Sequence, residues 1–286
     1  MLSPEISEYY RRGGERHRLA AGQGRLEFLR TWDVLTRVLP AAPADVLDVG
    51  GATGGYAGPL ANAGYRVRVV DPLPEHVAQA ATLPGVTAVP GDARALPAAD
   101  HSVDAVLLLG PLYHLPERAD RVAAWREAAR VVRPGGVVVG ATISRFASLF
   151  DGFVKDHFGD PRYRPLIEGA LADGVHRNTD TGRTWFTTAY FHHPDEMAGE
   201  ATEAGLGVRR VVAVEGPLWL TGPRLPEILA SPELTDLLLQ MMRAVEDEPS
   251  LLGASSHLLT VAHSPSNTSQ AFTTDMAART GVRDPG

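Results

Sequence analysis

The chain has 286 residues, of which 44% are hydrophobic and 21% charged, so it can bury a full core as one domain with an inserted or appended cap. Its formal net charge of −7 gives little attraction for a polyanion, which favours a small-molecule ligand over nucleic acid. The absence of cysteine excludes disulfides, thiolate metal sites and cysteine nucleophiles.

The sequence contains no stretch of the roughly 18 to 20 apolar residues that a membrane-spanning helix needs. Residues 1–18 are charged and aromatic, unlike a signal peptide. We therefore expect a cytoplasmic protein that has no membrane contact.

The first segment, residues 6–39, is predicted to be helical. Leu26, Leu29 and Leu35 mark one apolar side, and Pro40 ends the segment. The pattern then changes to short β-branched runs that alternate with helical stretches, which is typical of βαβ units and a parallel sheet. The predicted strands are residues 46–49, 66–70, 86–89, 104–109, 137–142, 207–215 and 257–262.

The alternation stops for about fifty residues after residue 142, in a stretch rich in aromatic side chains. We predict that this stretch forms a cap. The predicted division of the chain is a helical lid (1–40), an α/β core (41–143), an inserted cap (144–193), the remainder of the core (194–263) and a disordered tail (264–286), which is rich in Ser, Thr and Pro.

A glycine-rich turn follows the first strand, where residues 46–55 read VLDVGGATGG. Glycines let the backbone turn sharply and approach a ligand at the start of the next helix. The dinucleotide fingerprint fails in every register, because Ala52 or Thr53 stands where it requires glycine. No Gly-Lys-Ser/Thr follows the strand, so a P-loop is excluded as well. A nicotinamide oxidoreductase is therefore a distant alternative.

Other polar residues follow the next strands. Asp71 lies 23 positions after Asp48, close to the spacing of about 20 at which an acidic side chain reaches ribose hydroxyls. The alternative is that Asp71 only opens a turn with Pro72. Asp92 follows the third strand and either meets a ligand or caps the next segment.

The order of these motifs between residues 45 and 142 resembles that of the class I S-adenosylmethionine-dependent methyltransferases, whose first motif is approximately (E/D)-x-G-x-G-x-G. The run LGPLYHL after the fourth strand and Arg133-Pro134-Gly135-Gly136 before the fifth complete the pattern, and Ala52 replaces the middle glycine. The resemblance implies a doubly wound, mainly parallel α/β sheet of Rossmann-like type and S-adenosyl-L-methionine as cofactor. It also implies an enzyme that transfers a methyl group to a small organic molecule. It covers about half of the chain strongly and the cap hardly at all.

The resemblance also implies which residues hold the cofactor. Asp71 would bind the ribose and Asp92 would lie beside the adenine. Arg25 would bind the methionine carboxylate, although a solvated helix face is an equal alternative for it. The full predicted cofactor set is Asp48, Gly50, Gly51, Ala52, Gly54, Tyr56, Asp71, Pro72, Asp92, Ala93, Leu109, Gly110, Arg25 and Tyr10.

The candidate catalytic residues are Tyr113 and His114, at the end of the fourth strand, where open α/β sheets bind ligands. Histidine can act as a base at neutral pH, but a hydrogen-bonded structural role is the alternative. The predicted substrate-binding residues are Arg145, His176, Phe186, Tyr190, His192 and Trp219, and most of these aromatic side chains also fit a cap core. The histidines form no recognised metal pattern, so no metal is predicted.

Two rival functions share the same cofactor motifs. One is a module that binds S-adenosylmethionine without catalysis, and the other is an enzyme that uses the aminocarboxypropyl arm of the cofactor. Such motifs encode neither the methyl acceptor nor the oligomeric state.

Overall fold

The structure is a computed structural model that describes residues 4–11, 18–179 and 185–266. Its strands are β1 (Asp45–Val49), β2 (Arg66–Asp71), β3 (Val86–Pro90), β4 (Val103–Leu108), β5 (Val132–Ser144), β6 (Val175–His176), β7 (Ala189–His192), β8 (Gly207–Ala213) and β9 (His257–His263). Its α-helices are α1 (Pro4–Arg11), α3 (Gly22–Val38), α4 (Ala57–Asn62), α5 (Pro74–Ala80), α6 (Arg118–Val131), α7 (Ala147–Val154), α8 (Tyr163–Asp173), α9 (Glu196–Glu203), α10 (Leu225–Ala230), α11 (Pro232–Arg243) and α12 (Pro249–Leu252). Three 3-10 helices are η1 (Leu112–His114), η2 (His157–Gly159) and η3 (Gly216–Arg224).

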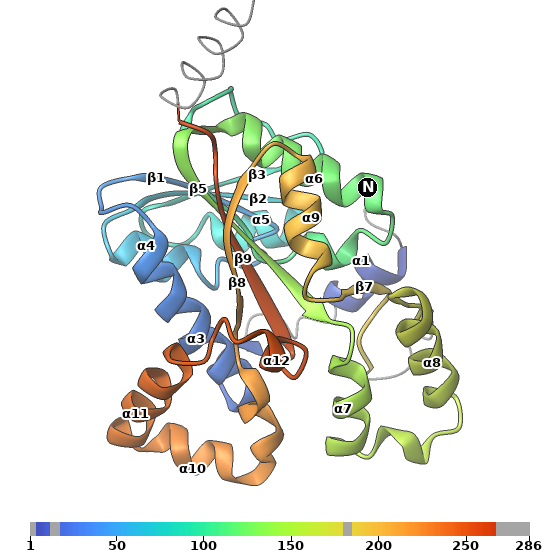
Figure 1. Ribbon diagram of the computed structural model, residues 1–286. Coiled ribbons are helices and arrows are strands. Elements are labelled where there is room, and N and C mark those ends of the chain that lie inside the picture. Colours follow the sequence, from blue (N-terminus) through green and yellow to red (C-terminus); the bar gives the residue numbers. More distant parts are fainter. Residues whose placement is uncertain (1–3, 12–17, 180–184, 267–286) are drawn as a thin grey trace, which may run out of the picture.

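The sheet is mainly parallel and runs through the centre of the molecule (Figure 1). Strands β3, β2, β1, β4 and β5 are neighbours in that order, and all of these pairs are parallel. Strand β9 pairs antiparallel with both β5 and β8. The last two residues of β5 pair with β7. The predicted fold class, a doubly wound α/β sheet, is confirmed.

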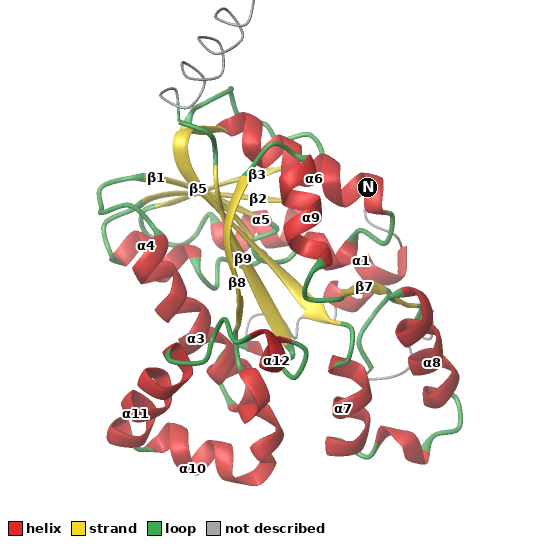
Figure 2. Ribbon diagram, in the orientation of Figure 1, coloured by secondary structure: helices red, strands yellow, loops and turns green. Residues whose placement is uncertain are grey.

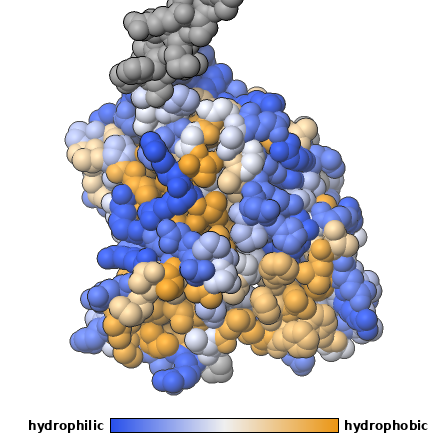
Figure 3. Space-filling model, in the orientation of Figure 1, coloured by the Kyte–Doolittle hydropathy of each residue, from blue (hydrophilic) through white to orange (hydrophobic). Residues whose placement is uncertain are grey.

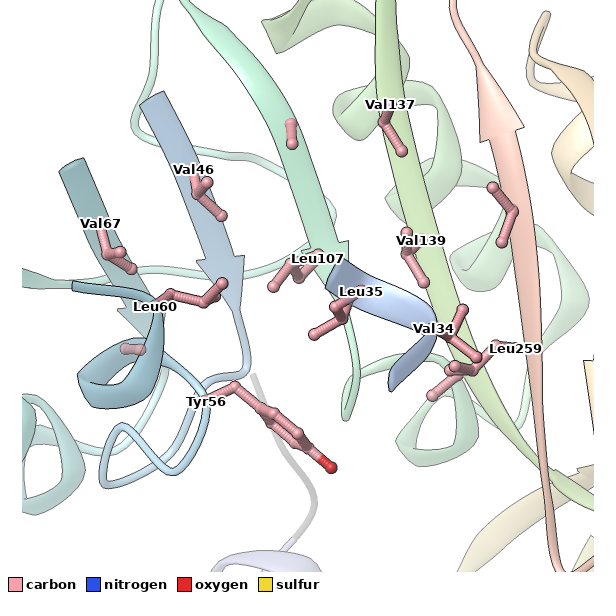
Figure 4. Packing of buried hydrophobic residues seen from close by; sticks show 14 of the residues in the cluster. Val34, Leu35, Val46, Tyr56, Leu60, Val67, Leu107, Val137, Val139 and Leu259 are labelled. Atoms are coloured by element: carbon pink, nitrogen blue, oxygen red, sulfur yellow. The ribbon is translucent and has the colours of Figure 1, made fainter. Parts of the chain in front are cut away.

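Helices cover both faces of the sheet because successive side chains of a buried strand point to opposite sides. Val46 and Leu107 lie on the face that packs against α3 and α4. Figure 4 shows Leu35 of α3 close to Leu107 on this face, and Val34 of the same helix close to Leu259. Leu47 and other side chains of the opposite face pack against α6 and α9. The strand ends are thereby fixed from both sides.

The predicted strands agree with the structure to within a few residues at most ends, but two predictions need correction. In its described residues, the first helical segment, expected to run from residue 6 to 39, includes helices α1 and α3 and has a turn at residues 19–21, and residues 12–17 lie outside the described part. Strand β5 begins at Val132 and includes the Pro-Gly-Gly turn that was expected to precede it. Most of the predicted tail, residues 267–286, lies outside the described residues, and the domain boundaries stay predictions.

Two groups of helices extend below the sheet in Figure 2, one formed by α7 and α8 and the other by α10 and α11. Figure 3 shows apolar surface over both groups. Phe153 on α7 is 73% exposed, and Leu234, Leu237 and Met241 on α11 are also exposed. Among the described residues, no helix is both long and apolar enough to cross a membrane.

A cluster of ion pairs holds α3 against the chain that follows α11. Arg30 is completely buried and donates to Asp33 at 2.7 Å and to Glu246 at 2.9 Å. Arg37 also donates to Glu246, at 2.7 Å. Arg210 of β8 donates to the same Glu246 at 2.9 Å, so the cluster also joins α3 to β8. Removing one partner would leave a buried charge uncompensated.

Candidate functional site

A cavity of about 280 Å³ lies at the carboxyl ends of β1, β2 and β4. We call it the strand-end cavity. Parallel sheets bind ligands at this edge, where the turns after the strands meet. Among the residues that line it are most of those predicted to hold the cofactor, together with both candidate catalytic residues: Tyr10, Asp48, Gly50, Gly51, Ala52, Tyr56, Asp71, Pro72, Asp92, Ala93, Leu109, Gly110, Tyr113 and His114.

The glycine turn after β1 lies tightly against its neighbours. A Cβ atom on Gly51 would lie 2.5 Å from Oδ2 of Asp48, so a side chain there would force the Asp48 carboxylate to move. Ala52 adopts a left-handed backbone conformation with φ of +48°, which costs a non-glycine residue about 1 to 2 kcal/mol. Ala52 replaces the middle glycine of the motif, but its backbone keeps the conformation that glycine favours.

Asp48, the last but one residue of β1, is only 1% exposed and lines the strand-end cavity. Among the described residues, neither of its carboxylate oxygens has a hydrogen-bond partner. Burial, reinforced by the negative charge of Asp71, raises the pKa of Asp48 to about 7. An unpartnered buried carboxylate is costly, so the site suits a ligand that brings hydrogen-bond donors.

Asp71, at the end of β2, holds three groups around the cavity. Its Oδ2 accepts a hydrogen bond from the amide of Ala52 at 3.0 Å. Its Oδ1 accepts from the amide of Leu73 at 2.9 Å and lies 3.1 Å from Nδ1 of His76. Asp71 therefore fixes the glycine turn as well as facing the cavity. His76 was not predicted, because a histidine inside a short helix carries no motif.

Asp92 follows β3 and is bound by Arg94. The guanidinium of Arg94 donates to Oδ2 of Asp92 at 2.6 Å and to Asp120 at 2.9 Å. The hydrogen bonds from Arg94 hold the pKa of Asp92 well below its ordinary range. Asp92 thus stays ionised at the cavity wall. It also accepts from the backbone amide of Arg94, a contact of the kind expected if it caps the next segment.

Helix α1 closes one side of the strand-end cavity through Tyr10. The hydroxyl of Tyr10 lies 2.6 Å from Nε2 of His114, and its ring packs edge-on against His76 and His114. Burial lowers the pKa of His114 to about 3, despite a backbone hydrogen bond with Thr188. The imidazole is therefore neutral, and the Tyr10 hydroxyl can donate to its Nε2.

Two residues predicted to hold the cofactor do not line the strand-end cavity. Arg25 is exposed on α3, and its guanidinium lies over the ring of Phe28, so its solvated alternative describes it better. Gly54 lies behind the turn, where an added Cβ would meet Leu83. Arg18, which lacks any motif in the sequence, does line the cavity, as does Arg94.

A second cavity, of about 570 Å³, lies between α3, the cap and the chain after β8. We call it the cap cavity. Arg18 lines both cavities, and the ring of Phe186 from the cap cavity stacks on His114 of the strand-end cavity at 5.8 Å. The predicted substrate residues that line the cap cavity are His176, Phe186 and Trp219. Burial lowers the pKa of His176 to about 4, so this ring is neutral.

The other three predicted substrate residues line neither cavity. Arg145 is buried and donates to the carbonyl of Phe191 at 2.7 Å and to Glu196 at 3.2 Å. The hydroxyl of Tyr190 donates to the same Glu196, and His192 is completely buried. Together these side chains fix the cap to α9. The polar atoms of Arg145 and Tyr190 form hydrogen bonds within the protein. The sequence pattern does not distinguish such an internal network from a binding surface.

The cap cavity also contains a charged cluster that the sequence did not reveal. Nδ1 of His257 lies 2.6 Å from Oε1 of Glu215, and Glu27 accepts from Arg18 at 2.5 Å. His257 is the first residue of β9 and pairs with Ile143 near the end of β5. Because β9 is antiparallel to β5, its first residue lies at the edge where the parallel strands end. The sequence does not report that β9 is antiparallel to β5, so it did not place His257 at this edge.

Residues 47–140 match the family model described as a methyltransferase domain. An uncharacterized methyltransferase of Mycobacterium tuberculosis H37Rv is 42% identical over 100 residues, which make up 35% of this chain and 40% of the relative. A ubiquinone biosynthesis O-methyltransferase of Methylobacterium sp. strain 4-46 is 33% identical over 111 residues, or 37% of this chain and 43% of the relative. The match therefore spans about two fifths of the length of these curated relatives.

A solved structure of an S-adenosylmethionine-dependent methyltransferase from Methanosarcina mazei superposes with a TM-score of 0.55 and 17% identity. The superposition covers 82% of this chain and 98% of that chain, so the two share a fold. The segment matched in sequence contains the end of β1 and the whole of β2 and β4, and the ends of these strands form the strand-end cavity. Residues 47–140 are thus similar to a methyltransferase domain, and the chain shares its fold with a solved S-adenosylmethionine-dependent methyltransferase.

Proposed function

We propose that this chain transfers the methyl group of S-adenosyl-L-methionine to a small organic molecule. The cofactor occupies the strand-end cavity and the acceptor occupies the cap cavity. The observation that carries the proposal is the buried carboxylate of Asp48, which lies at the cavity wall without a partner among the described residues. The cofactor offers donors of the kind this carboxylate lacks, in its ammonium group and its ribose hydroxyls.

The residues around the cavity fit the separate parts of such a ligand. Asp71 faces the ribose hydroxyls, because a carboxylate at the end of the second strand accepts from them. Ala93 and Asp92 line the adenine side. Arg18 takes the place that the sequence assigned to Arg25, since a guanidinium suits a carboxylate.

The bound cofactor supplies a methyl group on a positively charged sulfur, which is already electrophilic. The protein therefore has to position the acceptor and exclude water. Tyr10 of α1 covers the strand-end cavity, and Phe186 of the cap stacks on His114. These contacts link the lid, the wall of the strand-end cavity and the wall of the cap cavity.

The size and lining of the cap cavity support a small acceptor. Its volume of about 570 Å³ falls within the range of about 300 to 1,000 Å³ that is typical of small-molecule sites. Trp185, Phe186 and Trp219 give it flat apolar walls. The net charge of −7 also disfavours a nucleic acid as the acceptor.

For Tyr113 and His114 the geometry favours a positioning role. His114 is a weak base, because burial lowers its pKa to about 3. Its Nε2 is within hydrogen-bond distance of Tyr10. The hydroxyl of Tyr113 donates to the carbonyl of Leu109 at 3.4 Å, so this side chain supports the turn after β4.

Calorimetric titration with S-adenosylmethionine and with S-adenosylhomocysteine, followed by an acceptor screen with mass spectrometry, tests the proposal. We expect both ligands to bind and a product heavier than its acceptor by one CH₂. Binding without turnover on any acceptor would favour the non-catalytic module. A product that carries the aminocarboxypropyl group would favour the other alternative.

A further inference from the structure

We infer that His257, held by Glu215, binds the nucleophilic oxygen of the acceptor and removes its proton. The acceptor is accordingly a flat, largely apolar molecule with an acidic hydroxyl, such as a phenol or an enol. This inference rests on the proposed function, because it concerns the molecule that receives the methyl group in the cap cavity.

Glu215 fixes the orientation of the His257 ring. Its side chain is only 2% exposed and accepts from the backbone amide of His257 at 2.9 Å. It also accepts from the hydroxyl of Ser255 at 3.1 Å. A carboxylate that accepts from these donors and lies 2.6 Å from Nδ1 requires the ring proton on Nδ1.

The remaining ring nitrogen is the one available to a ligand. His257 lines the cap cavity and is partly exposed, and no group in the described part of the chain hydrogen bonds to its Nε2. A carboxylate that orients a histidine whose other nitrogen faces a cavity is the arrangement of a general base. The flat side chains around it, Trp185, Phe186 and Trp219, suit an unsaturated ring.

The two carboxylates of this cluster are already engaged. Glu27 accepts from Arg18 at 2.5 Å and Glu215 binds His257, although Glu27, Glu215 and His257 lie close enough together to consider a cation between them. A cation there would have to displace the proton between Nδ1 and Glu215. The pairing of Glu27 with Arg18 and of Glu215 with His257 also disfavours an amine acceptor. An ammonium group would approach the cationic side chains of Arg18 and of protonated His257.

The step balances without a further reactant. The acceptor hydroxyl gives its proton to Nε2 of His257, and the Glu215 carboxylate stabilises the imidazolium that results. The oxygen forms a bond to the methyl carbon while the carbon–sulfur bond breaks, and that electron pair stays on sulfur. The proton on His257 is then released to solvent.

The charges around His257 match this role. Burial disfavours the charged ring, but Glu27 and Glu215 outweigh it and raise the pKa of His257 to about 9. Arg18 opposes them weakly. The cap contributes further titratable groups that line the same cavity, namely Asp151, Lys155, His157 and His176. A ring with this pKa accepts a proton readily from a phenol, whose pKa is similar to that of tyrosine, about 10.

The free ring is protonated at neutral pH, whereas the productive complex holds one proton between the acceptor oxygen and Nε2. One proton must therefore be lost before the reaction. Consequently kcat/KM for a phenol with an ordinary pKa of about 10 should rise about tenfold for each pH unit toward pH 9 and level off above it. Glu215→Gln removes one of the two carboxylates, so it should move this inflection to lower pH, an effect that a purely structural role for Glu215 does not produce.

The test uses the full chain with S-adenosylmethionine and three matched probes, 4-nitrophenol, 4-nitroaniline and 4-nitroanisole. His257→Asn keeps an amide donor toward Glu215 but cannot take a proton. His263→Asn, at the other end of β9 and outside the cap cavity, is the matched control. Binding of each probe is measured by calorimetry, and the ionisation state of bound 4-nitrophenol by the visible absorbance of its phenolate. Methyl transfer is followed by mass spectrometry and the ring tautomer of His257 by nitrogen NMR.

We expect the wild-type protein and His263→Asn to bind 4-nitrophenol as its phenolate, at least about tenfold more tightly than the other two probes. His257→Asn should lose that preference and slow methyl transfer by about 100-fold or more, while cofactor affinity stays unchanged. Equal binding of all three probes, binding of none, or full activity in His257→Asn would overturn the inference.

Two further outcomes separate the inference from the proposed function. Methyl transfer to an amine that is unaffected by His257→Asn would leave the proposed function standing and refute the role of His257. Loss of activity on chelation, with recovery on adding a divalent metal, would assign the cluster to a cation instead. Failure of the wild-type chain to bind S-adenosylmethionine would refute the proposed function itself.

Discussion

The carboxylate of Asp71 accepts a hydrogen bond from the backbone amide of Ala52 across 3.0 Å. This contact joins the end of β2 to the turn after β1, so that one side chain both faces the cavity and fixes its glycine turn. The ligand-facing oxygens are therefore oriented by contacts within the protein. Such pre-organisation lowers the entropy that a ligand has to lose on binding.

Replacement of Asp71 by Ala should weaken both cofactor binding and the fold. We expect a loss of about 1 to 3 kcal/mol in cofactor binding, because a charge-assisted hydrogen bond to the ribose disappears. The free energy of unfolding should fall by a similar amount, about 1 to 3 kcal/mol, since the amides of Ala52 and Leu73 lose their acceptor. Calorimetry and denaturant titration measure the two effects. Asp100→Ala, an exposed carboxylate, is the control, and unchanged cofactor affinity in Asp71→Ala would remove Asp71 from the site.

Replacement of Ala52 by Gly should be tolerated or mildly stabilising. It relieves the positive φ, which costs about 1 to 2 kcal/mol, and it adds about 0.5 to 1 kcal/mol of unfolded-state entropy. The free energy of unfolding should therefore rise by up to about 1 kcal/mol. The same substitution at Ala123, within α6, should lower it by about 1 kcal/mol. A comparable loss at both positions would show that Ala52 is not strained.

Cofactor affinity should increase as the pH rises from about 6 to about 8. In the free protein the pKa of Asp48 is raised to about 7, so this group is protonated below that pH and must lose its proton to accept from a ligand. Calorimetry in buffers of different ionisation enthalpy would detect the released proton. Asp48→Asn should weaken binding and abolish its pH dependence, whereas an unchanged pH dependence would assign the proton to another group.

The same group makes the stability of the free protein depend on pH in the opposite sense. The folded protein keeps the Asp48 proton up to about pH 7, while the unfolded chain loses it near the ordinary value of 3.8. The folded state therefore binds more protons in this window, and the contribution of Asp48 to the free energy of unfolding falls as the pH rises from about 4 to about 7. Subtracting the profile of Asp48→Asn isolates that contribution.

Tyr10 and His114 should act as one unit in closing the lid. Tyr10→Phe removes the hydroxyl that lies 2.6 Å from Nε2 of His114 and should weaken cofactor binding by about 0.5 to 1.5 kcal/mol. His114→Ala should have a similar effect, and the double variant should lose less than the sum of the two. If His114 instead acts as the base, His114→Ala will slow turnover far more than it weakens cofactor binding, and Tyr10→Phe will not.

The sheet and the strand-end cavity could be predicted because local rules place them. Buried β-branched runs define the strands, and the ends of parallel strands meet at one edge, so Asp48 and Asp71 could be brought together without knowledge of tertiary contacts. Ala52 did not disturb this prediction, because the surrounding backbone holds it in the conformation that glycine favours.

The internal contacts of the cap and the charged cluster could not be predicted, because contacts between distant parts of the chain determine them. Arg145, a polar side chain, is buried and forms hydrogen bonds with the carbonyl of Phe191 and with Glu196 inside the protein. The cluster of Glu27 and His257 joins residues more than two hundred positions apart and depends on the direction of β9. No spacing in the sequence reports either relationship.

A crystal structure of the protein with S-adenosylhomocysteine tests the central claim most directly. We expect the adenosyl group to lie across the ends of β1, β2 and β4, with its ribose on Asp71 and its amino-acid end against the turn at residues 50–55. An empty strand-end cavity at saturating ligand, or the nucleoside bound at a different place on the protein, would contradict the assignment.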